Sequence, residues 1–125
     1  VPHDAFLSHL AAADVVVNLR RPAAGEGMEI VHAALGLRKP LIVSAEPSFS
    51  FLPPGAAFQL RADDLELEML TRMLGALARS PELRKAMGEA ARRYVEDVAD
   101  WSRVAHRFAQ FLYNAARRRC HVPAD

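Results

Sequence analysis

The chain has 125 residues, enough for one domain with a buried core but not for two. Hydrophobic residues make up 51% of it and charged residues 25%, the balance of an ordinary globular protein, and a net charge of +1 offers no bulk field that would attract nucleic acid. No apolar run approaches the about 20 residues that cross a bilayer, and the single cysteine, Cys120, cannot form an internal disulfide, which fits a reducing cytoplasm.

The first half of the chain alternates predicted helices and strands. A helix capped by its first residue, an aspartate, is predicted over 4–13, and the β-branched run 15–17 then predicts a strand covered on both faces. A loop rich in Pro and Gly follows over 21–27, and apolar residues recur at helical spacing over 28–37. A second buried strand is predicted over 41–43. This order is a βαβ unit and predicts a parallel sheet.

The second half is predicted to be mainly helical. A short third strand over 57–60, near an edge of the sheet, precedes a helix over 64–79. A second helix opens at Ser80, with the serine as its cap and proline at its first position. A third begins after Asp100, with an apolar stripe expected to pack inward that consists of Trp101, Val104, Ala105, Phe108 and Leu112. Residues 1–125 are therefore predicted to form a single partial α/β domain, Rossmann-like, with a short parallel sheet and a helical C-terminal half.

The segment 14–27 carries the chemistry, because it combines a buried strand, a Gly-rich turn and the start of a helix. Ligands of open parallel sheets bind beyond the carboxyl ends of the strands, where a helix N-terminus offers free N–H groups to a phosphate. Gly25 and Gly27 would let the backbone approach a ligand, and the Glu26 carboxylate can accept hydrogen bonds from vicinal sugar hydroxyls. The same Gly-Glu-Gly turn is also compatible with a plain helix start.

Five segments, in order, resemble the family 4 retaining glycosyltransferases, whose fold is called GT-B. They are the DVVVNLRRPAAGEG segment that begins at Asp14, GLRKPLIVS at 36–44, SFSFLP at 48–53, SPELR with AAR over 80–92, and W-x-x-V-A at 101–105. The resemblance covers nearly the whole chain. It implies the C-terminal part of the domain that binds the nucleotide-diphosphate sugar donor, in an enzyme that transfers a hexose to an acceptor with retention and uses no metal or cofactor.

The resemblance also implies roles for individual residues. Glu26 would contact hydroxyls of the donor sugar, and Gly27 and Met28 would present backbone N–H groups to the sugar or its diphosphate. Gly25 completes the turn, and Arg20 leads into the site, where it either contacts a phosphate or forms a structural salt bridge. No catalytic residue is assigned. The acceptor domain and the basic residues that hold the diphosphate would precede Val1, so the chain alone is expected to bind the donor weakly and to be inactive.

Three positions depart from the family pattern. Ala33 and Ala34 occupy the region of the second glutamate, which in relatives binds the ribose, and Glu29 stands where relatives carry a small residue. Arg38 replaces the glycine expected before Lys-Pro. Two of these changes weaken donor binding. The alternative reading is therefore a non-catalytic Rossmann-like module that oligomerises. A dinucleotide-binding oxidoreductase fits less well, because no G-x-G-x-x-G follows a predicted strand.

Two further expectations concern partners. An unpaired sheet edge at 15–17 or 41–43, or the apolar helix faces beside it, predicts a homo-oligomer. The arginines at 117–119 either contact an anionic membrane surface or complement the dipole of the last helix, and three are fewer than a lipid-binding cluster usually has. The five histidines show no metal-ligand spacing. A chain that opens without Met, directly into a helix pattern, reads as a piece of a longer protein or as a processed chain.

Overall fold

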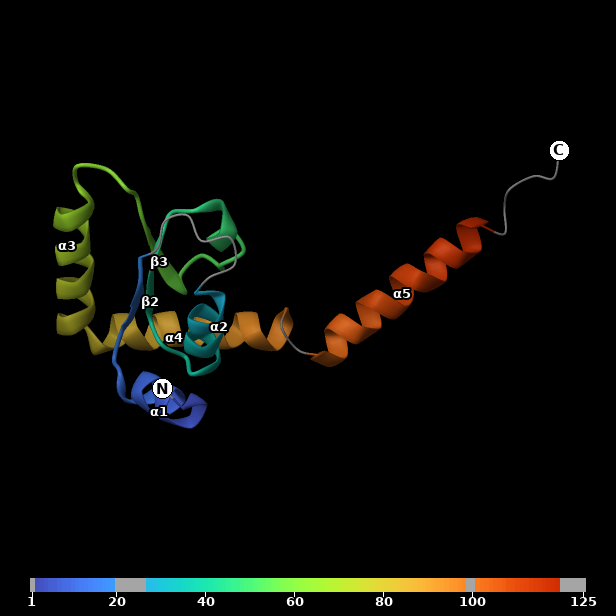
Figure 1. Ribbon diagram of the computed structural model, residues 1–125, viewed down its shortest axis with the longest axis horizontal. Coiled ribbons are helices and arrows are strands. Elements are labelled where there is room, and N and C mark those ends of the chain that lie inside the picture. Colours follow the sequence, from blue (N-terminus) through green and yellow to red (C-terminus); the bar gives the residue numbers. More distant parts are fainter. Residues whose placement is uncertain (1, 20–26, 99–100, 120–125) are drawn as a thin grey trace. The chain divides into compact units, whose positions relative to one another are not determined.

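The computed structural model describes residues 2–19, 27–98 and 101–119 (Figure 1). The chain forms two compact units, residues 1–93 and residues 94–125. Its elements, in chain order, are α1 (His3–Ala12), β1 (Val16–Asn18), α2 (Met28–Gly36), β2 (Leu41–Ser44), the 3-10 helix η1 (Pro47–Phe49), β3 (Ala57–Leu60), α3 (Glu66–Arg79), α4 (Pro81–Asp97) and α5 (Trp101–Arg119).

A three-stranded parallel sheet forms the centre of the first unit, with the strand order β1-β2-β3. Val16 of β1 pairs with Leu41 of β2, and Leu41 pairs in turn with Ala57 of β3. All four residues of β2 are buried, as a continuous apolar run predicts for the central strand of a covered parallel sheet. The predicted α/β fold, its parallel sheet and its short third strand at an edge are confirmed.

Side chains of the sheet alternate between two apolar layers. On one side, Ile42 and Leu60 pack in a cluster with Leu77 of α3 and Met87 of α4. On the other side, α2 contacts β1 and β2. The side chains that α2 buries are Val31, Ala34 and Leu35. These apolar residues recur at helical spacing, so they form one face of α2, and this face packs on the sheet to complete the βαβ unit.

The turn from α2 into β2 has an unusual backbone. Arg38 adopts φ 58°, in the left-handed region where a side chain costs about 1–2 kcal/mol and glycine costs little. The Arg38 N–H donates to the carbonyl of Leu35 at 3.1 Å, and the Lys39 N–H donates to that of Ala34 at 2.9 Å. The Lys39 ammonium also reaches α1, where it donates to the carbonyl of Ala11 at 2.7 Å. Arg38 thus holds a turn conformation that glycine would adopt with less strain.

The start of α4 is capped as predicted. The Ser80 hydroxyl accepts a hydrogen bond from the Leu83 N–H at 3.1 Å, which satisfies one of the free N–H groups of the first turn. At the start of α3, the Asp63 carboxylate accepts from the Leu65 N–H at 3.0 Å. The helix then begins at Glu66, slightly later than predicted, because two turn residues are needed after Asp63.

The predicted cap of α1 is wrong. This helix begins at His3, so Asp4 lies within its first turn, and Pro2 holds the cap position without a side-chain hydrogen bond. Proline has φ fixed near the value that a helix entry needs, which lets the helix begin one residue before the aspartate. Asp4 remains favourable there, since its charge complements the positive end of the helix dipole.

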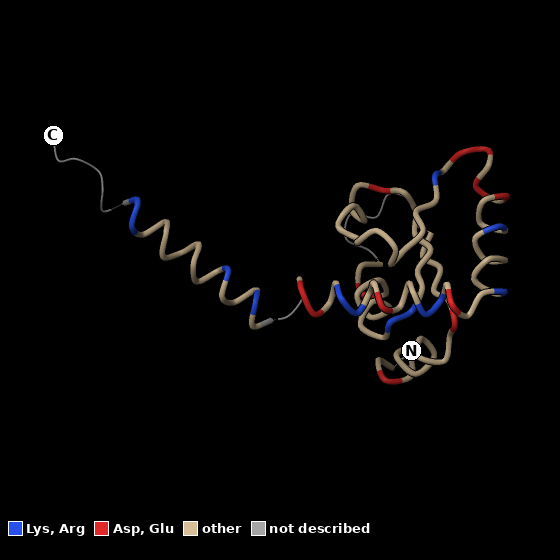
Figure 2. Tube along the Cα trace, turned by 180° about the vertical axis from the view of Figure 1, so that it is seen from behind, with Lys and Arg blue, Asp and Glu red and all other residues tan. Residues whose placement is uncertain are grey.

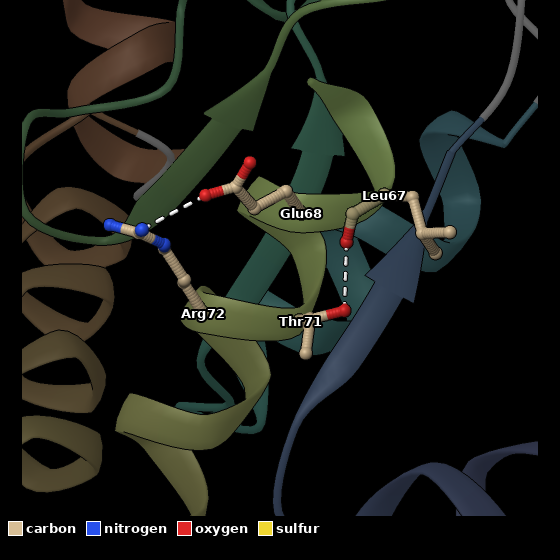
Figure 3. A network of polar contacts seen from close by, with 4 residues as sticks. All are labelled: Leu67, Glu68, Thr71 and Arg72. Carbon is tan, nitrogen blue, oxygen red and sulfur yellow. Dashed lines mark hydrogen bonds and ion pairs between the residues drawn. The ribbon is translucent and has the colours of Figure 1, made fainter. Parts of the chain in front are cut away.

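Two polar contacts lie on the exposed side of α3, next to the exposed side chain of Leu67. Arg72 forms an ion pair with Glu68 at 2.9 Å, and the Thr71 hydroxyl donates to the backbone carbonyl of Leu67 at 2.8 Å (Figure 3). The ion pair joins side chains four positions apart, the spacing at which they meet on a helix. The opposite face of α3, with Leu70, Met73 and Leu77, packs on the sheet.

The last helix, α5, begins after Asp100 as predicted, but its stripe is not packed as predicted. Val104, Phe108 and Leu112 are exposed, and the side chain of Trp101 lies outside the described residues. Among the described residues of the second unit, 94–98 and 101–119, no strand is present that could cover the stripe. Within residues 2–19, 27–98 and 101–119, no helix has the length and apolarity needed to cross a bilayer.

Candidate functional site

The predicted donor site lies where β1 ends and α2 begins. Arg20, Gly25 and Glu26 fall outside the described residues, whereas Gly27 and Met28 are described. Gly27 is the residue that precedes α2, and Met28 is its first helical residue. The described part of the site therefore consists of the start of α2 and the end of β1.

The end of β1 is joined directly to the start of α2. Asn18, the last residue of β1, is buried, and its side-chain amide donates to the carbonyl of Gly27 at 3.2 Å. This contact spans the loop between the two elements and fixes the helix N-terminus at the carboxyl end of the strand. The family resemblance implies that Asn18 shapes the loop leading into the site, but it does not imply this hydrogen bond to the helix start. In the sequence, Asn18 stands out only as a polar residue at the end of an apolar strand.

Gly27 has a conformation that few other residues adopt. Its φ is 84°, in the left-handed region, where a Cβ atom would be strained. The helix starts immediately afterwards, with the Val31 N–H donating to the Gly27 carbonyl at 3.3 Å. This backbone angle favours glycine at position 27, and the approach of a ligand to it stays a prediction.

Among the described residues, nothing accepts hydrogen bonds from the first N–H groups of α2. The N–H groups of Met28, Glu29 and Ile30 have no partner inside the helix, because a helix leaves the donors of its first turn unpaired. No side chain among the described residues caps this end. Their combined partial positive charge suits an anion, and the exposed Glu29 carboxylate in the same turn opposes one.

The loop after β2 lies against α2. His32, on the second turn of α2, has its ring 5.7 Å from that of Phe51, at a tilt of 42°. The same loop is held to the sheet where the Ala45 N–H donates to the carbonyl of Leu60 at 2.8 Å. The sequence pattern did not predict this contact. The two phenylalanines of the loop were its only signal.

A hollow of about 240 Å³ lies at the carboxyl end of β3, away from the β1–α2 turn, and was not predicted. Its lining includes Arg61 and Asp63, with Met69 and Met73 from α3. The Asp63 carboxylate accepts a hydrogen bond from the Leu65 N–H in the turn before α3. The part of the chain that the structure describes holds no cluster of three or more His, Cys, Asp or Glu side chains suited to a metal ion.

These features define an α/β protein in which a helix N-terminus lies at the carboxyl end of a strand of a parallel sheet. No protein-family model matches the sequence, and neither a curated protein nor a solved structure gives a significant match.

Proposed function

We propose that the chain is the C-terminal part of the donor-binding domain of a GT-B glycosyltransferase, which transfers a hexose from a nucleotide-diphosphate sugar with retention. In this proposal the β1–α2 turn contacts the donor. The transfer itself needs the acceptor domain, so the chain alone binds the donor weakly and does not turn it over.

One observation carries this proposal. The N-terminus of α2, which no described side chain caps, lies at the carboxyl end of β1 and is held there by the hydrogen bond from Asn18 to the Gly27 carbonyl. A diphosphate can accept hydrogen bonds from the free N–H groups of Met28 and its neighbours, and the left-handed Gly27 lets it approach the backbone. Glu26 precedes this turn in the sequence, at the position where the family resemblance assigns the sugar hydroxyls.

Titration with UDP- and GDP-sugars, followed by NMR, tests the donor site. We expect amide shifts centred on Gly27 to Ile30 with a dissociation constant on the order of millimolar, about −4 kcal/mol, and no turnover. Removing the Glu29 charge with Glu29→Gln should tighten binding about twofold to fivefold, because a like charge leaves the phosphate site. Glu26→Ala should weaken it.

The matched control is Glu82→Gln, which removes the same charge from the first turn of α4 and should leave donor binding unchanged. Shifts that map away from the start of α2, or that persist unaltered in Glu26→Ala, would rule out the donor-site assignment. Micromolar affinity for a nucleotide sugar would contradict the expectation that the chain alone binds the donor weakly.

A second candidate function is a non-catalytic module that assembles with its own copies, and the free edge of the sheet favours it. Among the described residues, β1 pairs only with β2. Val17, on the same side of the sheet as its partner Ile42, is 43% exposed, and on α3 the side chains of Leu67 and Leu74 are exposed as well. A hollow of about 410 Å³ lies beside the start of β1, lined in part by Val15 and Leu74. An apolar edge of this kind is a template for another chain.

Light scattering over a range of protein concentrations tests this assembly. We expect a dimer, because a second copy can pair its own β1 along the free edge and cover the exposed valine. Val17→Lys should give a monomer, whereas Leu37→Lys, at a site of similar exposure at the end of α2, should remain a dimer. A wild-type chain that stays monomeric at high concentration would contradict the assembly without bearing on the donor site.

A further inference from the structure

The last helix carries a continuous apolar stripe that its own unit does not cover. Val104, Phe108, Phe111 and Leu112 recur at intervals of three and four residues, so they lie along one side of α5. Their exposed fractions are 41%, 62%, 66% and 51%. Every side chain described from 102 to 118 is exposed. A stripe with two exposed phenylalanines on neighbouring turns is unusual for a helix surrounded by water.

The charges of α5 have one sign. The helix contains no aspartate or glutamate, and its arginines are Arg103, Arg107, Arg117, Arg118 and Arg119. Figure 2 shows only basic residues coloured along it, in contrast to the mixed charges of α3 and α4. The net charge of the whole chain is +1, so this helix is a local concentration of positive charge that the overall composition conceals. A cluster of this size reaches the number that attracts anionic lipid.

The cations and the stripe are arranged to act together. Arg107, Phe111 and Arg118 are four and seven residues apart, which places two guanidinium groups along the border of the apolar stripe. Long arginine side chains at such a border can reach headgroup phosphates while the aromatic rings lie deeper. Arg117 lies 5.8 Å from the ring centre of Tyr113, and Arg103 forms an ion pair with Asp97 at 3.2 Å, which fixes the first turn relative to the end of α4 within this unit.

We propose that α5 binds in the plane of an anionic lipid surface, with its phenylalanines inserted among the acyl chains and its arginines on the phosphates. A helix of this length extends about 28 Å, and a membrane surface can accept its aromatic stripe and its border arginines along that whole length. A second copy of α5 would instead bring like charges together. The proposal is independent of the donor site, which lies on other elements.

Vesicle binding by the complete chain tests the proposal, with phosphatidylcholine vesicles compared with vesicles that also contain phosphatidylglycerol. The single tryptophan, Trp101, begins α5 and reports insertion by a blue shift of its fluorescence. We expect binding and a blue shift with the anionic vesicles alone, and release at high salt as the screening length falls from about 8 Å to about 3 Å. Arg107→Gln with Arg118→Gln should reduce binding about 25-fold, or about fivefold per arginine.

Matched controls separate this surface from a general effect of charge. Arg72→Gln with Arg79→Gln removes the same charge from exposed positions of α3 and should change binding less than twofold. Phe108→Gln with Phe111→Gln should abolish the blue shift while circular dichroism shows the helix retained. Equal binding to neutral vesicles, an equal loss in the α3 variant, or no binding at all would overturn the proposal. So would a lipid-free dimer that dissociates in the phenylalanine variant, since a second copy would then occupy the stripe.

Discussion

Replacing Leu77 with alanine is expected to lower the free energy of unfolding by about 3–4 kcal/mol, measured by urea denaturation with circular dichroism. Leu77 is fully buried at the point where α3 meets the sheet, in one cluster with Ile42, Leu60 and Met87. The substitution removes buried methyl groups and leaves a cavity that three different elements line. Since a domain of this size is stable by about 5–15 kcal/mol in total, the loss is a large part of it.

Leu67 provides the control on the same helix. It is 75% exposed, so Leu67→Ala removes the same atoms without making a cavity and should change the free energy of unfolding by less than about 0.5 kcal/mol. Similar losses in the two variants would mean that α3 does not pack on the sheet through the face that Leu77 marks.

The sheet could be predicted from the sequence because its physical signal is local and strong. The apolar run 41–43 has no polar side chain to offer water, so this strand needs cover on two faces, which a parallel sheet provides. The same prediction for the valines at 15–17 is wrong on one face, because β1 lies at the edge of the sheet and Val17 is 43% exposed. The start of α4 could also be predicted from the sequence, because the Ser80 hydroxyl accepts from a backbone N–H that would otherwise be unpaired. These residues act through neighbours that are close in the sequence, so their structure can be predicted without knowing the tertiary contacts.

Other features depend on contacts that no local pattern contains. The left-handed backbone at Arg38 follows from how α2 turns into β2, and an arginine gives no sign of it. The amide of Asn18 meets Gly27 only once the loop has closed. For α5, the periodicity predicted an amphipathic helix, but such a pattern does not say what covers the apolar face. The stripe was predicted to pack inward, whereas within its own unit Val104, Phe108 and Leu112 are exposed.

At the candidate site, the sequence located the helix start at Gly27 and Met28, because glycine marks a backbone conformation that side chains rarely adopt. It could not anticipate the ring contact between His32 and Phe51, which depends on the path of the loop after β2. Arg20, Gly25 and Glu26 remain predictions, since they lie outside the described residues.

Gly88→Ala is expected to lower the free energy of unfolding by about 1–2 kcal/mol, although alanine favours helices. Gly88 lies within α4, where alanine alone would add about 1 kcal/mol of stability. A Cβ atom there, however, would lie 2.7 Å from the carbonyl oxygen of Arg38, closer than unstrained contacts allow. Overpacking of this kind costs about 1–3 kcal/mol. The upper part of that range applies because two backbone hydrogen bonds, at Arg38 and Lys39, hold the turn in place.

Gly75→Ala is the same chemical change in α3 and should have the opposite sign. Its Cβ would meet only the guanidinium of Arg79, at 3.2 Å, and the end of an exposed arginine can move aside at little cost. The helix preference then dominates, and we expect a gain of about 0.5–1 kcal/mol in the same denaturation experiment. If both alanines stabilise the chain, α4 does not press on the α2–β2 turn, and the close approach at Gly88 is not part of the fold in solution. Opposite signs would show that the left-handed Arg38 turn is the surface on which α4 packs.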